Sequence, residues 1–448
     1  MKFLGSICAG LLAMGVASAP GQTAGNAPSP IDLPTALRLA GAQNLDIQIA
    51  RQALLESKAN HENAVAQFFP WLGPGFAYHR RDGSSQFFPT GIVTNDAHLD
   101  SYAPGATFMA QENLGDAIYN SLASRQRVNA SGQALEAQRQ VTLLAAAQGY
   151  FDLAKAQALA GVIRQALATS RDYQQQLHSA VELGIAFKGD EIRVQTQSGS
   201  YEMALRQATE QQRIAAAALA QVLRLDPVVE LVPREEEMAP LRLIETNAAL
   251  GTLVERALLF RPELRQSQAL ILAAQDTKNG AVYGALFPSL NAQVFAGGFG
   301  GGPENGHGSF GAAEDYQFGL SWRIGPGGLF DAGRVHASKA RLAATQLSDA
   351  KLKDAIVVEV VAGFTRVEST AAQIDLAGNN LSSANETLRL TRERKQFGVG
   401  AVLEDIQAQQ ALTQARSDYV TALAEYNKAQ YQLNKAVGGL TGTNQPGK

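Results

Sequence analysis

Cysteine and long apolar stretches are nearly absent from this chain of 448 residues. Its only cysteine, Cys8, lies in an N-terminal apolar segment, and Gly5-Ser6-Ile7 before it lacks the leucine and the small residue of a bacterial lipid-attachment site. If Cys8 is removed with that segment, the mature chain has neither disulfide nor thiol, and packing must stabilise it. No apolar run of about 18 residues follows, which excludes a membrane-spanning helix. If the mature chain spans a membrane, it must do so as a closed β-barrel.

Residue patterns that carry chemistry are also missing. Gly306 to Gly311 spells a dinucleotide-binding fingerprint, but it precedes an alternating segment instead of opening a helix, which indicates a loop. Ser348 and Lys351 have Ser-Lys hydrolase spacing, but they lie within a helical stretch and lack companion motifs. No metal-ligand spacing is found among the six histidines, at 61, 79, 98, 178, 307 and 336. The sequence therefore predicts no catalytic residue, no metal, no cofactor and no enzyme.

The composition is that of a folded, exported protein. With 46% hydrophobic and 18% charged residues, the chain is too apolar to be disordered. The formal net charge is −3 and the basic residues are scattered, so nucleic acid is not an expected partner. Lys2, the apolar stretch from Phe3 to Val16 and the small residues Ala17 to Ala19 indicate a secretory signal peptide at 1–19, although Pro20 leaves its cleavage point open. A membrane anchor is the alternative, but about 14 apolar residues are too few to span.

The order of features along the chain occurs twice. Phe69-Pro70 returns as Phe287-Pro288, 218 positions later. Leu183-Gly184-Ile185 returns as Phe397-Gly398-Val399, 214 positions later, and Asp190 matches Glu404 with that same offset. A constant offset through several features predicts two internal repeats, at 20–231 and 247–440. Prolines and acidic residues predict a connector at 232–246, and 441–448 is predicted to be a flexible tail.

After each aromatic-proline pair the apolar period changes from helical to alternating. The expected strands are Trp71 to His79, Ala106 to Leu114, Leu290 to Ala296 and Tyr316 to Ile324, with loops from Arg80 to Gly105 and from Gly297 to Asp315. In the last strand five apolar side chains share one face, which is expected to face lipid: Tyr316, Phe318, Leu320, Trp322 and Ile324. Four strands cannot close a barrel, whereas three chains supply about 12. A small sheet in a soluble protein fits the strands equally well.

Long helices favour the first of these readings. Arg334 to Gln396 contains no proline and predicts about 95 Å of helix. Apolar residues along it are spaced by threes and fours, as in a coiled-coil seam, from Leu352 through Ile356, Val360, Phe364 and Val367 to Leu388. The first half repeats this from about Ser121 to Val181. Glycine-containing turns at Gly184 and Gly398 then predict two long antiparallel helical hairpins, whose polar, Ala-rich surfaces suit the wall of a hollow tube.

At this point the sequence resembles the outer-membrane efflux protein family, the TolC-like channels. Leu329-Phe330-Asp331-Ala332-Gly333-Arg334 is similar to the family's passage from strand to helix, usually with glycine at the position of Ala332. Gly184 to Gln195 and Gly398 to Gln409 are similar to its two helical turns. The resemblance implies an α+β membrane protein: a homotrimer with a 12-stranded barrel in the outer membrane of a Gram-negative bacterium, continued by a long periplasmic α-helical barrel.

The same resemblance implies passive conduction, in a tripartite export system with an inner-membrane pump and a periplasmic adaptor. The hairpin ends then form a periplasmic aperture lined by Asp190, Glu404, Asp405 and Gln407, although Asp405 stands where the family is usually apolar and Gln407 where an aspartate is common. Helix N-terminal charge is an alternative role for Glu404 and Asp405. The adaptor-docking tips are expected at Gly184, Ile185, Ala186, Gly398, Val399 and Gly400.

Two other classes of protein compete with a channel. A periplasmic coiled-coil adaptor or structural protein would need one hairpin with compact β-domains, whereas this chain has two hairpins and membrane-like strands. A secreted hydrolase would need a nucleophile, a base and an orienting group that the sequence does not bring together. The exported substrate and the pump cannot be read from the residues.

Overall fold

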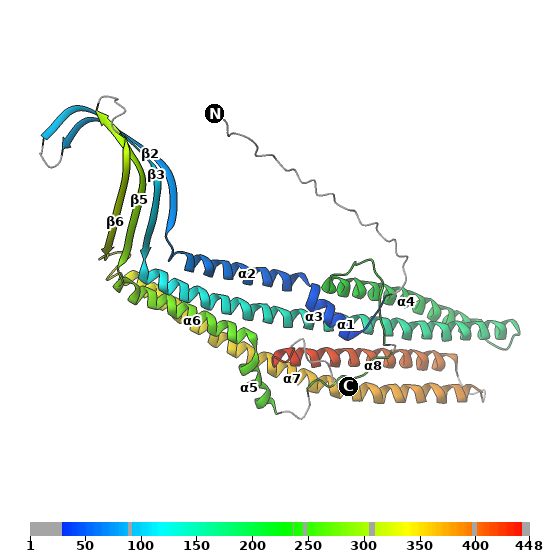
Figure 1. Cartoon of the computed structure of the whole chain (residues 1–448). Coiled ribbons are helices and arrows are strands. Elements are labelled where there is room, and N and C mark those ends of the chain that lie inside the picture. Colours follow the sequence, from blue (N-terminus) through cyan, green and yellow to red (C-terminus); the bar gives the residue numbers. More distant parts are fainter. Residues whose placement is uncertain are drawn as a thin grey trace, which may run out of the picture.

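A computed structural model describes residues 29–87, 92–235, 237–244, 249–303, 310–396 and 401–440. A four-stranded sheet forms one end of an elongated molecule, and long helices run from its base to the other end (Figure 1). The predicted signal peptide and tail lie outside the described residues. None of the helices in the described ranges is both long and apolar enough to cross a membrane.

The first half begins with two helices, α1 (Leu33–Gln43) and α2 (Leu45–Ala66). Two long strands follow, β2 (Trp71–Phe87) and β3 (Ile92–Asn113). The chain then forms α3 (Leu114–Glu182), whose 69 residues extend about 100 Å, and returns as α4 (Lys188–Leu223). This half therefore ends in a long antiparallel helical hairpin, as the sequence predicts.

The second half has the same order of elements. Its two opening helices, α5 (Leu250–Phe260) and α6 (Pro262–Tyr283), have 11 and 22 residues, the same lengths as α1 and α2. A short 3-10 turn, η1 (Gly284–Leu286), leads into β5 (Ser289–Pro303) and β6 (Gly311–Ser321). The second helical hairpin consists of α7 (Ala332–Gln396) and α8 (Val402–Ala436).

Side-chain caps determine where several of these helices begin. Asp32 accepts a hydrogen bond from the backbone N of Thr35 at 2.8 Å and caps α1. Asn44 accepts from the N of Asp46 at 2.8 Å, and so starts α2 directly after α1 ends. Before α7, the carboxylate of Asp331 accepts from the N of Arg334 at 2.9 Å and from the N of Gly327 at 2.8 Å. The predicted passage from strand to helix is therefore a capped turn.

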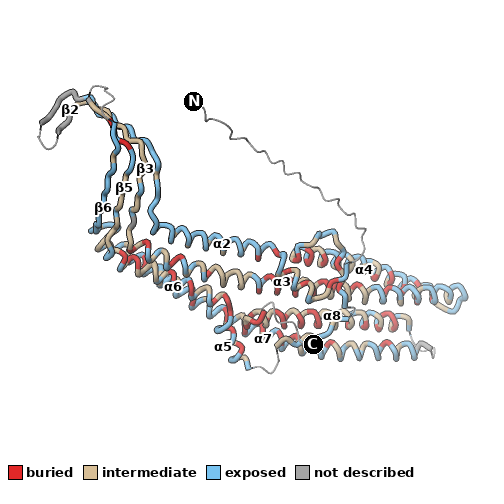
Figure 2. Tube along the Cα trace, in the orientation of Figure 1, coloured by how far each residue is buried: buried red, intermediate tan, exposed pale blue. Residues whose placement is uncertain are grey.

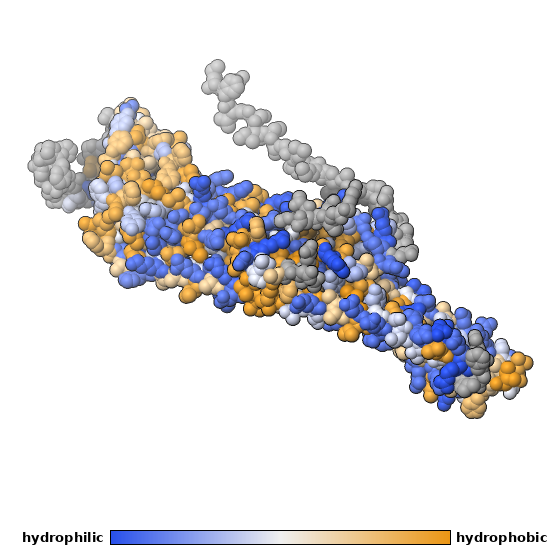
Figure 3. Space-filling view, turned by 90° about the horizontal axis from the view of Figure 1, so that it is seen from below, coloured by the Kyte–Doolittle hydropathy of each residue, from blue (hydrophilic) through white to orange (hydrophobic). Residues whose placement is uncertain are grey.

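The sheet has strand order β2-β3-β5-β6 and is antiparallel throughout, and residues paired across it share a face. One row crosses all four strands with apolar side chains: Leu72, Phe108, Val294 and Tyr316. The next row, on the opposite face, is mostly polar on β5 and β6, where Gln293 pairs with Gln317. Alternation along the sequence thus becomes one apolar and one polar face. Figure 3 shows apolar residues gathered at the sheet end.

All four predicted strands were wrong in their limits. The strands are longer than expected, because most of the Gly-rich segment after Ala296 and of the segment from Arg80 to Gly105 continues the ladder. Gly300 pairs with Tyr102, for example, whose ring occupies the space that a side chain at Gly300 would need. The last strand ends at Ser321, so Trp322 and Ile324 lie beyond it. Ile324 instead bridges to Leu329.

The helices are held together by the seam that the sequence predicts. Ile356, Val360 and Val367 of α7 are buried against Leu433 of α8, whereas few residues of the sheet are buried (Figure 2). At Gly363 a Cβ atom would lie 3.4 Å from Leu433 Cδ1. In the first hairpin the corresponding distance from Gly149 to Leu219 Cδ1 is 3.3 Å. Glycine therefore allows the same close approach of helices in both hairpins.

The connector between the halves lies along α8. Asn427 is fully buried and accepts a hydrogen bond from the N of Leu241 at 2.8 Å, while its amide donates to the carbonyl of Ala239 at 2.9 Å. A second contact near the middle joins the two hairpins, because Lys428 of α8 donates to Asp152 of α3 at 2.9 Å. At the start of the connector, strand β4 (Leu231–Pro233) pairs in parallel with β1 (Ser29–Ile31).

Candidate functional site

The end of the first hairpin is a tight turn closed by glycine. Gly184 has φ +73°, and its N donates to the carbonyl of Val181 at 3.0 Å. The N of Ile185 donates to the carbonyl of Ala180 at 2.9 Å, and the two bonds together form a Schellman motif. The predicted glycine turn is present, and a left-handed residue is what it requires.

Three large apolar side chains project from this turn. Leu183, Ile185 and Phe187 are 75%, 77% and 72% exposed. Ala186 is half-buried and packs toward the hairpin core instead. The matching tip of the second hairpin, Gly398, Val399 and Gly400, lies outside the described residues.

Acidic residues occupy the first turn of α4. Asp190 forms an ion pair with Arg193 at 3.0 Å. Glu191 is buried, and it accepts hydrogen bonds from Lys188 Nζ at 2.6 Å and from His178 Nδ1 at 2.8 Å. The hydrogen bond from Lys188, followed by that from His178, holds the pKa of Glu191 below its ordinary 4.5. Both carboxylate oxygens of Glu191 are therefore compensated within the first hairpin.

The first turn of α8 has the same acidic pair with different surroundings. Glu404 is half-exposed and forms an ion pair with Arg394 of α7 at 3.3 Å. Asp405 is only 3% exposed. Its Oδ2 accepts from Gln409 at 3.0 Å, and its Oδ1 has no hydrogen-bond partner among the described residues. Gln407 is exposed.

An apolar cluster places Asp405 at the contact between the two hairpins. Ile406, beside Asp405, is buried against Tyr173 and Leu177 of α3 and Val194 of α4. Burial raises the pKa of Tyr173 to about 12, with further contributions from the negative charges of Asp405 and Asp190. The structure thus brings Asp190 and Asp405 to the same phenol, while Glu404 and Gln407 remain on more open surface.

Sequence reasoning missed the partners of this site. Tyr173, Glu191 and Arg394 are not among the predicted site residues, and His178 was considered only as a metal ligand. The 214-residue offset that relates Asp190 to Glu404 also relates Glu191 to Asp405, and it could have pointed to Glu191. Nothing in the sequence alone shows that Tyr173 lies beside α8. Within the described ranges, no group of three or more His, Cys, Asp or Glu residues is arranged to hold a metal ion.

The predicted lipid-facing residues fall into two sets. Tyr316, Phe318 and Leu320 lie on β6 and are 60% to 71% exposed. Trp322 and Ile324 are also exposed, but they lie past the strand end, where the indole N of Trp322 donates to the carbonyl of Leu286 at 3.2 Å. A large apolar surface open to the surroundings at this end of the molecule is unusual for a protein that remains in water.

Comparison with known proteins matches this geometry. Residues 253–439 match the model of the outer membrane efflux protein family. The predicted resemblance is confirmed. This family is one of channel proteins of the outer membrane that extend into the periplasm. A search of curated protein sequences finds no match.

Solved structures with a similar fold are outer-membrane channels. The chain is 17% identical to the Campylobacter jejuni CmeC outer membrane channel, with a TM-score of 0.77 over 91% of this chain and 85% of that chain. For the open state of the Neisseria gonorrhoeae MtrE outer membrane channel these values are 19%, 0.72, 92% and 90%. For CusC, studied for folding and transmembrane channel formation, they are 17%, 0.74, 93% and 96%. The shared property is the fold, along nearly the whole chain.

Proposed function

We propose that this chain is the outer-membrane channel subunit of a tripartite export system. Three copies close a 12-stranded barrel and a helical tube, and substrates pass through passively from an inner-membrane pump joined by a periplasmic adaptor. The observation that carries the proposal is the continuity of the sheet with the helices. The strand order β2-β3-β5-β6 continues as α2, α3, α6 and α7, each the helix next to its strand along the chain: α3 follows β3 without a break, and short connections join the other three. Such a subunit carries out no catalysis.

The open edges of the sheet support three-fold closure. Among the described strands, β2 pairs with β3 alone and β6 with β5 alone, so each outer edge presents unpaired backbone groups. In a membrane every such group must be satisfied, because water is not there to bond it. Pairing of β6 with β2 of the next copy satisfies both edges and keeps the face with Tyr316, Phe318 and Leu320 toward lipid.

The hairpin ends are the proposed aperture. Asp190, Glu404 and Gln407 are the side chains with solvent access there, and three copies of Glu404 would concentrate negative potential in a narrow pore. Asp405 has a different role in this proposal. It is buried between the hairpins, so its charge affects the stability of the contact between α8 and α3. The exposed tip of Leu183, Ile185 and Phe187 is the proposed adaptor contact, together with Gly184, Ala186 and the corresponding residues 398–400.

Conductance in a planar bilayer tests this function. We expect the purified chain to form discrete, cation-preferring channels, and Glu404→Ala to reduce the preference for cations because it removes three charges from the pore. Glu210→Ala, on the exposed part of α4 away from the hairpin end, is the matched control. Channels unaffected by Glu404→Ala would place the constriction elsewhere. Folded protein that stays water-soluble without detergent and forms no channels would rule out the barrel and favour an adaptor.

A further inference from the structure

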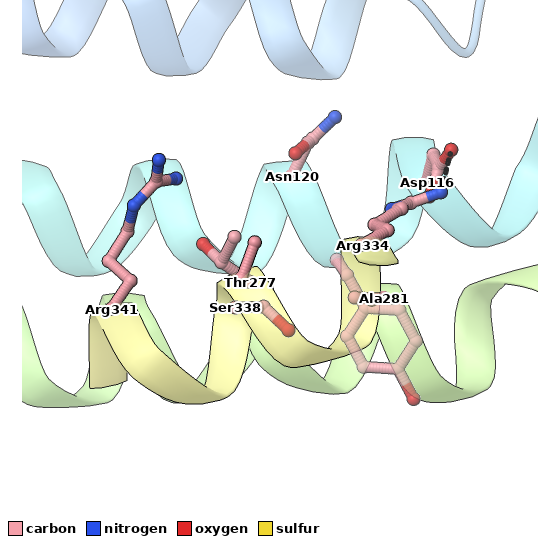
Figure 4. A pocket seen from close by; sticks show the side chains of 10 residues that line it. Asp116, Asn120, Thr277, Ala281, Arg334, Ser338 and Arg341 are labelled. Atoms are coloured by element: carbon pink, nitrogen blue, oxygen red, sulfur yellow. Dashed lines mark hydrogen bonds and ion pairs between the residues drawn. The ribbon is translucent and has the colours of Figure 1, made fainter. Parts of the chain in front are cut away.

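A polar cavity of about 210 Å³ lies directly beneath the sheet, between the upper ends of α3, α6 and α7 (Figure 4). Its polar lining residues are Asp116, Asn120, Thr277, Arg334, Ser338 and Arg341. Arg334 is two residues into α7, and Arg341 is two helical turns further along, about 10 Å from it. Figure 4 shows these two arginines on either side of Asn120.

The hydrogen bonds in this cavity leave it with positive charge. Arg334 forms a bidentate pair with Asp116, so these two charges compensate each other. Thr277 and Ser338 donate their hydroxyl hydrogens to the backbone carbonyls of Ala273 and Val335, each at 2.9 Å, and therefore offer no donor to a ligand.

Two lining side chains remain to bind a ligand. Arg341 makes no ion pair within the described ranges of the chain, and the amide of Asn120 makes no hydrogen bond there. A guanidinium and an amide together favour an anion with several acceptor oxygens.

Exposed aromatic residues surround the base of the sheet close to this cavity. This aromatic band consists of Phe69, Tyr283, Phe287 and Trp322, all between 44% and 70% exposed. The lining helix α6 leads straight into it, since Tyr283 follows the lining residue Gly280 by one helical turn. Aromatic residues of this kind mark the interface between membrane and water. The headgroup layer there is roughly 5 to 8 Å thick, and the helical rise from Gly280 to Tyr283 is about 4.5 Å.

We propose that this cavity binds the phosphate of a phospholipid from the inner leaflet, held by Arg341 and Asn120, with the acyl chains along the aromatic band. The proposal rests on the proposed placement of the sheet in the membrane. A bound headgroup would fix α3, α6 and α7 against one another at the point where the strands become helices. It would also set the depth at which the sheet enters the bilayer.

Tryptophan fluorescence tests the proposal, because the chain has only two tryptophans and one of them, Trp322, lies in the aromatic band. The full chain in uncharged detergent is titrated with short-chain phosphatidylglycerol, with dioctanoylglycerol, which lacks the phosphate, and with inorganic phosphate. We expect saturable binding of phosphatidylglycerol alone. Arg341→Gln should weaken it about tenfold, as loss of a charged hydrogen bond does.

Lys339→Gln is the matched control, since Lys339 is exposed like Arg341 and lies two residues away on α7, but does not line the cavity. It should bind like the unchanged chain, and Arg341→Lys should keep part of the affinity. Equal weakening by Arg341→Gln and Lys339→Gln would overturn the cavity site in favour of surface charge. Equal binding of inorganic phosphate would overturn the lipid as its source. Bilayer conductance of Arg341→Gln should persist, which separates this test from that of the channel.

Discussion

The two hairpin ends carry the same acidic pair and treat it differently. In the first hairpin Glu191 is bonded by Lys188 and His178, and both of its oxygens are satisfied. In the second, Asp405 has a single hydrogen-bond partner among the described residues, Gln409, and its buried Oδ1 has none there. An uncompensated buried carboxylate oxygen costs free energy, whereas a compensated one does not. The buried carboxylate at the first end is therefore compensated, whereas burial of Asp405 at the contact between the hairpins costs folding free energy.

The packing around the two hairpin ends explains why their acidic residues differ in environment. Ile406 of α8 is 8% exposed because α3 and α4 pack on it. Ile192, at the same place in α4, is 52% exposed. At this position the second return helix is thus covered within the subunit and the first is not. Movement of α8 away from α3 would open the buried side of Asp405 to water, so this contact is the one suited to loosen if the proposed aperture opens.

The largest effect on stability is expected from removing the buried side chain in this difference in packing. Ile406→Ala should lower stability by about 2 to 4 kcal/mol, because it empties a buried site. Ile192→Ala, the matched change on the exposed helix, should cost less than about 0.5 kcal/mol. Thermal unfolding of the detergent-solubilised protein, with hydrogen exchange at the start of α8, measures both. Equal losses would mean that Ile192 is also covered in the assembled protein.

The next prediction compares Glu191 with Asp405, because neutralising the two carboxylates should change the melting midpoint in different directions. Glu191→Gln should lower the midpoint of thermal unfolding by roughly 1 to 3 °C, since it weakens two charged hydrogen bonds. Asp405→Asn should leave it unchanged or raise it, because the buried negative charge disappears and Gln409 can still bond the amide. Melting curves of both variants at neutral pH provide the measurement. A loss of stability in Asp405→Asn would show that its charge has a partner in the assembly.

The lowered pKa of Glu191 predicts how the stability of the protein changes at acid pH. The pKa of Glu191 is lowered on folding, so its stabilising contribution is present above about pH 4.5, the ordinary value, and is lost as the pH falls below that through the folded pKa. Carboxyl groups ordinarily titrate between roughly pH 3 and pH 6. Over this range the melting midpoint should fall less steeply for Glu191→Gln than for the unchanged chain. Parallel curves for the two would contradict the prediction.

Much of this architecture could be predicted from the sequence, and the reasons are physical. The seam from Leu352 to Leu388 is periodic, and periodicity directly determines which helix face is buried. Strand limits were harder, because Gly297 to Pro303 has no apolar alternation and joins the ladder through backbone bonds that glycine permits. The partners at the hairpin ends could not be predicted, since Tyr173 and Asp405 are far apart in sequence and meet only when α8 packs on α3.

Titration of the Tyr173 phenol tests directly whether Asp405 lies beside Tyr173. The pKa of Tyr173 is raised to about 12, first by burial and then by Asp405 and Asp190. Below pH 10, the ordinary value, its stabilising contribution is fully present, and it is lost as the pH rises through about 12. Asp405→Asn should move the tyrosinate absorbance of this residue to lower pH, with Tyr173→Phe identifying the signal. An unchanged titration would mean that Asp405 does not face Tyr173 in the assembled protein.

The smallest effect concerns the exposed pair across the second hairpin. Arg394→Gln should change stability by less than about 1 kcal/mol, because an ion pair in water is screened. It should nonetheless free the charge of Glu404 and so increase cation preference in the bilayer, most clearly at low salt, where the Debye length is longest. Arg389→Gln, which breaks ion pairs confined to α7 itself, is the matched control and should leave ion preference unchanged. The two hairpin ends would then differ in a third respect: the first holds its acids with neighbours in the same hairpin, while Glu404 in the second has one ion-pair partner among the described residues, Arg394, whose loss would reach the proposed pore.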